Sequence, residues 1–189
     1  MHHIHHTDAF VLKSHSAGED SKTLVLYTRE LGLIYARAQG LRKISSRLRY
    51  ILQDYSRANI DLVRGKEIWR VTTAAPITSH SSLRRKEESE KIIARLSSLV
   101  VRLVNGEEAN LEVFAAIERT YGMLDENDLS KEQYRSIELL GVTKVLIALG
   151  YLPRTLLEQD EGIPEAFADS AYQHRLIRDI NQALSASQL

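Results

Sequence analysis

The residues from Arg37 to Arg49 (RAQGLRKISSRLR) are of a type and spacing that suit a polyanion. This stretch carries five positive charges, on Arg37, Arg42, Lys43, Arg47 and Arg49, and it contains no acidic residue. The whole chain has 25 basic and 25 acidic residues, so its formal net charge is zero. Gly40 and the pair Ser45-Ser46 let the backbone approach a ligand and add neutral hydrogen bonds. Contacts of this kind bind phosphates and supply affinity without sequence information.

Nearby residues extend the same hypothesis. Arg64 and Lys66 flank Gly65 in a predicted hairpin turn, and Tyr50 follows Arg49 directly. An aromatic ring that stacks on a base contributes about 1–3 kcal/mol. Tyr35 and Trp69 are expected to fill the core instead, because aromatic rings in a small barrel are usually buried. We predict nucleic-acid contacts at Arg37, Arg42, Lys43, Arg47, Arg49, Arg64, Lys66 and Tyr50; the alternative for the charged stretch is a solvated loop.

The charge separates into two halves. Residues 1–80 contain 12 basic and 7 acidic residues, a net charge of +5, and residues 81–189 contain 13 and 18, a net charge of −5. Opposite signs in the two halves indicate two modules with different surfaces. A basic module typically meets a polyanion, so the first half is the candidate for nucleic acid.

The first half reads as five strands. Short apolar runs, bounded by glycine and other turn residues, occupy residues 9–14, 23–28, 33–38, 58–63 and 68–74. No long helical pattern separates them, and the basic stretch lies between the third and fourth runs. A five-stranded Greek-key barrel of this kind is the OB-fold, whose face and loops bind oligonucleotides. We therefore predict an α+β protein: an OB-fold β-barrel over residues 1–79 and an all-α helical domain over residues 80–189.

The second half shows helical spacing. Apolar residues recur on one side from Ile92 to Leu103, and Gly106 is expected to cap that helix at its C-terminus. Asn110 is a favourable N-cap for a second helix. Ser130 and Gln133 form a capping-box pattern at the start of a third, which runs to Gly150. A last helix is predicted from about Tyr172 to Leu184.

The motifs of common enzymes and metal sites are missing from the sequence. There is no phosphate-binding loop, no His-Glu-x-x-His and no Gly-x-Ser-x-Gly. The chain has no cysteine, which excludes disulfides and thiolate metal sites and fits a reducing cytoplasm. The histidine-rich start (residues 2–6) is expected to be a disordered or tag-like end. We predict no catalytic residue, no metal, no cofactor, no small-molecule substrate and no membrane segment.

The segment from Thr7 to Arg49 resembles the N-terminal domain of the RecO family of bacterial DNA repair proteins. The resemblance is carried by Ala9–Leu12, Gly18-Glu19, Thr28–Gly32 and Ala38–Leu48, in that order. It continues more loosely in Asp61-Leu62, Arg64-Gly65 and Leu149–Pro153.

The resemblance implies an OB-fold followed by helices, and a DNA repair and recombination mediator rather than an enzyme. It implies binding of single- and double-stranded DNA and annealing of complementary strands. It also implies partners: RecR, the C-terminal tail of the single-stranded-DNA-binding protein, and the RecA recombinase, whose loading the family assists. Many members carry a four-cysteine zinc motif after the Gly-Tyr-x-Pro segment. This chain has none, and it looks like a short, zinc-free variant.

Two other functions fit the same composition. An OB-fold RNA-binding module would use the same loop charge, and competition between RNA and DNA of equal length separates it from a DNA-binding protein. A non-catalytic protein-interaction adaptor would use the barrel as a scaffold, and it predicts no salt-dependent nucleic-acid binding.

Overall fold

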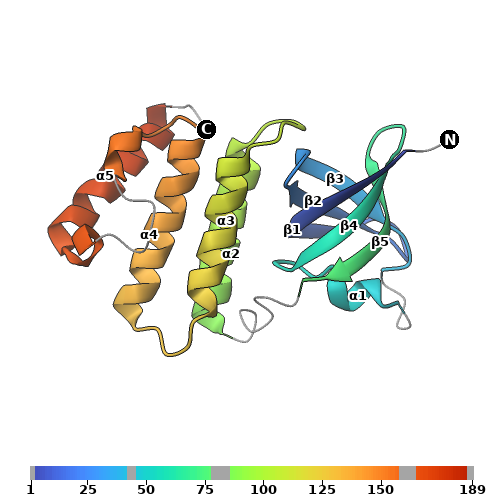
Figure 1. Ribbon diagram of the computed structural model, residues 1–189, viewed down its shortest axis with the longest axis horizontal. Helices are drawn as coiled ribbons and strands as arrows, with labels where there is room; N and C mark the ends of the chain where they lie inside the picture. The colour runs from blue at the N-terminus through green and yellow to red at the C-terminus, as the bar shows by residue number, and fades with distance from the viewer. Residues whose placement is uncertain (1–2, 42–45, 78–85, 158–164, 187–189) are drawn as a thin grey trace.

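The computed structural model describes residues 3–41, 46–77, 86–157 and 165–186, and it places a β-barrel beside a stack of helices (Figure 1). The barrel strands are β1 (Ile4–Ser16), β2 (Lys22–Thr28), β3 (Gly32–Ala38), β4 (Arg57–Arg64) and β5 (Trp69–Pro76), with a short helix α1 (Leu48–Ile51) between β3 and β4. The helices that follow are α2 (Glu87–Leu103), α3 (Leu111–Asp125), α4 (Lys131–Ala148) and α5 (Ser170–Ala186). Two 3₁₀ turns, η2 (Arg154–Leu156) and η3 (Glu165–Ala168), lie between α4 and α5.

The barrel closes in the order β1-β2-β3-β5-β4, and β4 pairs back onto β1. All neighbouring pairs are antiparallel except β3 and β5, which run parallel. β1 is long enough to pair with both β2 and β4, and a bulge between Val11 and Lys13 bends it from one to the other. This arrangement confirms the predicted five-stranded OB-fold barrel followed by helices.

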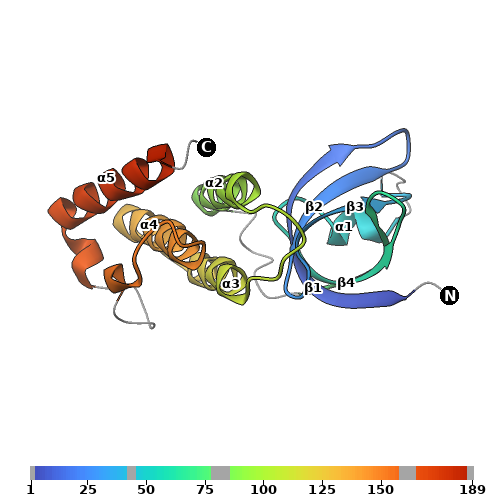
Figure 2. The ribbon, with the colours of Figure 1, turned by 90° about the horizontal axis from the view of Figure 1, so that it is seen from above.

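Successive side chains of a strand point to opposite faces of the barrel wall, and some strands are apolar on both faces. The inward face contributes the barrel core, which contains Ala9, Val11, Leu24, Leu26, Ile34, Ala36, Ala38, Leu41, Leu52, Ala58, Ile60, Leu62, Trp69 and Val71. The outward face of β1 and β2 is also buried. Phe10, Leu12, Val25, Tyr27 and Leu33 join a second core with residues of α2, α3 and α4. The helices thus cover one side of the barrel, as Figure 2 shows from above.

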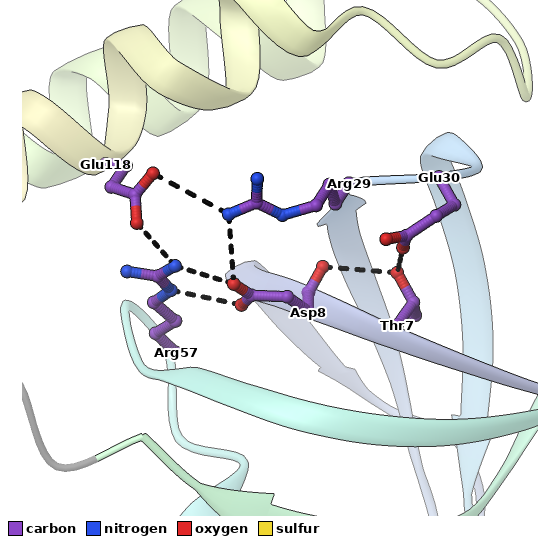
Figure 3. Close-up of polar contacts among 6 residues, drawn as sticks. All are labelled: Thr7, Asp8, Arg29, Glu30, Arg57 and Glu118. Atoms are coloured by element: carbon purple, nitrogen blue, oxygen red, sulfur yellow. Dashed lines mark hydrogen bonds and ion pairs between the residues drawn. The ribbon is translucent and has the colours of Figure 1, made fainter.

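A charged network crosses this junction between barrel and helices (Figure 3). Arg57 donates to both carboxylate oxygens of Asp8, from Nε at 3.0 Å and from Nη2 at 2.6 Å. The same Nη2 lies 2.6 Å from Oε1 of Glu118 on α3. Arg29 approaches Asp8 and Glu118 at 3.6 and 3.7 Å. The hydrogen bonds to Asp8 raise the pKa of the Arg57 guanidinium, which keeps it charged although its side chain is only 9% exposed.

Aromatic rings pack beneath this network. The Arg29 guanidinium lies 4.5 Å from the centroid of the Phe114 ring, and the Phe10 ring lies 5.0 Å from the same centroid. The Tyr27 hydroxyl donates to the carbonyl of Asn110 at 3.1 Å, and burial raises the pKa of Tyr27 to about 12. Gly32 marks a close approach: a Cβ there would lie 2.1 Å from the carbonyl oxygen of Glu108, at a φ of +68°. The chain between α2 and α3 is therefore pressed against the start of β3.

The predicted helix starts are confirmed. The Asn110 side chain accepts from the backbone N–H groups of Glu112 and Val113, both at 3.1 Å. Ser130 and Gln133 form the reciprocal capping box. The predicted C-cap at Gly106 is wrong. The helix ends at Leu103, because Val104 turns to an extended conformation and buries its side chain, and Gly106 lies further along the connecting loop with a φ of +85°.

The expectation of a disordered or tag-like start is also wrong from Ile4 onward. Ile4, His5 and His6 pair with Val63, Leu62 and Asp61 as the first residues of β1. His6 Nδ1 lies 2.5 Å from Asp61 Oδ1, and Thr73 donates to Asp61 Oδ2 at 2.5 Å. Among the described residues no group of three or more histidine and carboxylate side chains is placed to hold a metal ion. None of the described helices is long and apolar enough to cross a membrane.

Candidate nucleic-acid interface

Two arginines lie side by side on the outer face of β3 and β5. The parallel register pairs Arg37 with Arg70, and both side chains are exposed. Tyr35 lies two residues before Arg37 on the same face of β3 and is 47% exposed. Within the described parts of the chain, no carboxylate forms an ion pair with either arginine. This face therefore offers two uncompensated cations beside an exposed aromatic ring, a combination that suits a nucleic-acid strand.

The short helix α1 presents the second group of predicted residues. Leu48 and Ile51 are three positions apart and pack against the barrel core, so Arg49 and Tyr50 between them point outward. Tyr50 is 65% exposed, and Arg47, just before the helix, is exposed as well. The sequence left the position of the Tyr50 ring open, and the structure places it at the surface.

The two groups meet at the end of β3, where Arg37 faces outward and Ala38 faces the barrel core. Arg37 donates to the carbonyl of Ala17 in the turn between β1 and β2 at 3.3 Å. Next to Arg37 on β3, Ala38 pairs with Lys22 of β2, and Lys22 and Arg49 line the same hollow. We call the set Tyr35, Arg37, Arg70, Lys22, Arg47, Arg49 and Tyr50 the cationic face. Glu19 and Asp20 in the β1–β2 turn are exposed carboxylates, and the cationic face ends at that turn.

Arg64 is the last residue of β4, and Lys66 lies in the turn between β4 and β5, at the opposite end of the barrel from α1 in Figure 1. Gly65 in this turn is close to Arg70: a Cβ placed on Gly65 would lie 3.9 Å from the Arg70 side chain. The turn therefore continues the cationic face. Lys66 is exposed. Arg64 forms an ion pair with Glu107, and its guanidinium lies 4.9 Å from the centroid of the Trp69 ring. A contact from Arg64 to phosphate would have to compete with that carboxylate, whereas no described carboxylate forms an ion pair with Lys66.

The remaining sequence predictions have different outcomes. Arg42 and Lys43 lie outside the described residues. Trp69 is 4% exposed and fills the barrel, as predicted. The expectation for Tyr35 is wrong, because its position in β3 alternates with the buried Ile34 and Ala36 and therefore faces outward. Sequence reasoning also missed Arg70; its charge is visible in the chain, but its position beside Arg37 depends on a register between distant strands.

A larger hollow of about 760 Å³ lies over α3 and α4, and it is a poor candidate for nucleic acid. Its lining includes Glu112 and Glu118 as well as Arg119, Lys144 and Arg154. Arg154 already binds Glu112, from Nη2 to Oε1 at 2.7 Å. Carboxylates in the lining repel phosphates, so the cationic face of the barrel remains the better interface.

The closed barrel, its cationic face and the attached helices define an OB-fold protein with a helical C-terminal part. Residues 1–80 match the family described as Recombination protein O N terminal. Over the barrel and beyond it, the chain is similar to proteins of the RecO family.

Curated relatives match beyond the barrel. The DNA repair protein RecO of Heliobacterium modesticaldum is 31% identical over 169 residues, which cover 88% of this chain and 59% of the relative. The protein of the same name from Pelotomaculum thermopropionicum is 32% identical over 150 residues, or 79% of this chain and 57% of the relative. The one from Desulfitobacterium hafniense strain Y51 is 38% identical over 80 residues, or 42% and 29%. The chain thus spans less than two thirds of the length of these relatives.

Proposed function

We propose that this chain is a DNA-binding protein of repair and recombination that holds nucleic-acid backbones on the cationic face of its barrel. The observation that carries the proposal is the pairing of Arg37 with Arg70 beside the exposed Tyr35. The relatives are named DNA repair proteins, which supports both a role in repair and DNA as the nucleic acid that is bound.

The physical action that fits this face is strand annealing without bond-breaking chemistry. Two complementary strands repel each other through their phosphates, and a cationic surface screens that repulsion while the bases pair. Contacts to phosphate carry no sequence information, so single- and double-stranded DNA of any sequence would bind. Exposed rings on the same face would favour the single strand, because its bases are free to stack.

The partners proposed with this function are RecR, the C-terminal tail of the single-stranded-DNA-binding protein, and the RecA recombinase during loading. They rest on the similarity to RecO proteins alone. The interaction with the C-terminal tail of the single-stranded-DNA-binding protein can be tested by fluorescence anisotropy with a labelled tail peptide. If the peptide does not bind at micromolar concentrations of this protein, that partner is removed from the proposal.

The DNA-binding proposal predicts a specific effect of charge on affinity. The double variant Arg37→Gln and Arg70→Gln should weaken binding of a labelled single strand at least about tenfold at low salt, because two phosphate contacts are lost. The matched control is Arg102→Gln with Arg135→Gln, which removes two exposed arginines from α2 and α4. Net charge changes equally in both variants, so only the site differs.

Equal weakening in both double variants would contradict this interface. A competition experiment with RNA of the same length and sequence distinguishes DNA binding from the alternative RNA-binding function. The alternative predicts that RNA displaces the labelled DNA. A chain that binds neither polymer at low salt would instead favour the adaptor.

A further inference from the structure

The second half of β1 contains a bulge that decides which face of the barrel wall its side chains occupy. Val11 pairs with Leu26 and Lys13 pairs with Val25, so Leu12 is the extra residue. Side chains alternate between the two faces of a regular strand, so Lys13 would otherwise share the inner face of Val11. The bulge moves Lys13 to the outer face, where its partner Val25 packs against the helices.

The strand register continues this outer face across the barrel wall. His15 of β1 pairs with Thr23 of β2, and Thr23 pairs in turn with Arg37 of β3. Arg37 pairs with Arg70 of β5. Because the side chains of directly paired residues lie on the same face, these four residues form one row across four strands. Neighbouring strands are about 4.8 Å apart, so the row is roughly 14 Å long.

A second row, which consists of Lys13, Val25 and Tyr35, runs beside the first. Val25 is 1% exposed because the helices cover it, whereas Lys13 is exposed and Tyr35 is 47% exposed. Lys13 and Tyr35 therefore border the helical layer. The first row lies beyond this border, and its two ends, His15 and Arg70, are both exposed. We call the two rows without the covered Val25 the outer strip.

The charges of the outer strip suit a polyanion. Lys13 is exposed, and no carboxylate of the described residues forms an ion pair with it. The Arg37 guanidinium reaches from β3 to the β1–β2 turn, where it donates to the carbonyl of Ala17 at 3.3 Å, two residues after His15. Its positive charge therefore lies near the end of β1. Exposed carboxylates of the same turn, at residues 19–20, repel phosphates and limit the strip on that side.

We infer that a bound single strand crosses β1, β2, β3 and β5 along the outer strip, which adds Lys13 and His15 to the binding site. This inference rests on the proposed function and gives the strand a direction on the barrel. The Lys13 ammonium carries three donors and holds a phosphate as a point charge. The His15 ring donates or accepts a hydrogen bond, or stacks on a base, beside that phosphate.

The charge of Lys13 provides the first test. Lys13→Gln should weaken binding of a labelled 15-nucleotide thymidine strand about five- to tenfold at about 50 mM salt, because one phosphate contact contributes roughly 0.7 to the slope of log affinity against log salt. That slope should become less steep by the same amount. Lys13→Arg keeps the charge and should keep the affinity. The matched control, Lys131→Gln at the exposed start of α4, removes the same charge and should leave the affinity nearly unchanged.

Protection of a thiol provides a second test, which reports position rather than charge. The chain has no cysteine, so His15→Cys introduces a single thiol on the outer strip. Iodoacetamide should alkylate this thiol several-fold more slowly when the protein is saturated with the thymidine strand, because the bound strand covers it. Lys131→Cys is the control, since its thiol on α4 should react at the same rate with and without the strand.

The outcomes separate this inference from the proposed function. If Lys13→Gln binds as tightly as Lys131→Gln, or if the strand does not slow alkylation in His15→Cys, the path over β1 is overturned and DNA binding elsewhere on the barrel is left in place. If the unmodified chain fails to bind the strand at low salt, the proposed function is overturned, and the path over β1 falls with it.

Discussion

Replacing Arg57 with alanine should lower the free energy of unfolding by about 3–5 kcal/mol, because the largely buried Asp8 carboxylate loses two hydrogen bonds and keeps only the more distant Arg29. Arg57 is 9% exposed and holds Asp8, which is 15% exposed, by two hydrogen bonds. The substitution also removes the guanidinium from above the Phe10 ring, whose centroid lies 5.2 Å from Cζ. Urea unfolding, followed by circular dichroism, measures the loss.

A second arginine pair provides the control for this prediction. Arg95 on α2 binds Glu138 on α4 with two hydrogen bonds, but its side chain is 55% exposed. An exposed pair contributes at most about 1 kcal/mol, so Arg95→Ala should have a small effect. Asp8→Ala combined with Arg57→Ala should cost less than the two single changes together, by about 1–3 kcal/mol, because each single change already removes the two hydrogen bonds that join these residues. The account of the junction is wrong if Arg57→Ala costs no more than Arg95→Ala.

Residues 1–79 expressed alone should fail to give a stable monomer. The helices bury five large side chains on the outer face of the barrel, namely Phe10, Leu12, Val25, Tyr27 and Leu33, each at most 5% exposed. Full burial of each contributes about 1.5–3 kcal/mol, and their sum is comparable to the whole stability of a typical domain, about 5–15 kcal/mol. Without the helices this patch would be open to water and to other copies.

Size-exclusion chromatography and circular dichroism measure this effect. The truncated chain should elute as aggregates or show little cooperative unfolding. A truncated variant with Leu12→Thr and Val25→Thr tests the cause, since threonine suits a strand and removes part of the apolar surface. Its aggregation should be lower than that of the parent fragment. A monomeric fragment that unfolds at the same midpoint as the full chain would show that the junction does not stabilise the barrel.

Much of the fold could be predicted from local patterns in the chain. Turn residues bounded the strands, and side-chain chemistry identified the helix starts at Asn110 and Ser130. The runs AFVLKS and TLVLYT each contain four consecutive apolar residues rather than alternating ones, which is typical of strands buried on both faces. They already indicated that another layer covers β1 and β2.

The interface was harder to predict because it depends on long-range pairing. Arg37 and Arg70 meet only through the parallel register of β3 and β5, which no local pattern specifies. The outward position of Tyr35 follows from the alternation of side chains along β3. The prediction that Tyr35 is buried was wrong because it relied on the general preference for aromatic residues in barrel cores.

The most direct test of nucleic-acid binding by the barrel is the affinity for a labelled single strand against salt concentration, for the unmodified chain and for the variant with Arg37→Gln and Arg70→Gln. If about four phosphates are neutralised, log affinity should fall against log salt with a slope near about −3, at roughly 0.7 per phosphate. Loss of two contacts should reduce the steepness of that slope by about 1.4. A slope that is the same in both proteins, or no binding at low salt, would contradict the central claim that this face holds a nucleic-acid backbone.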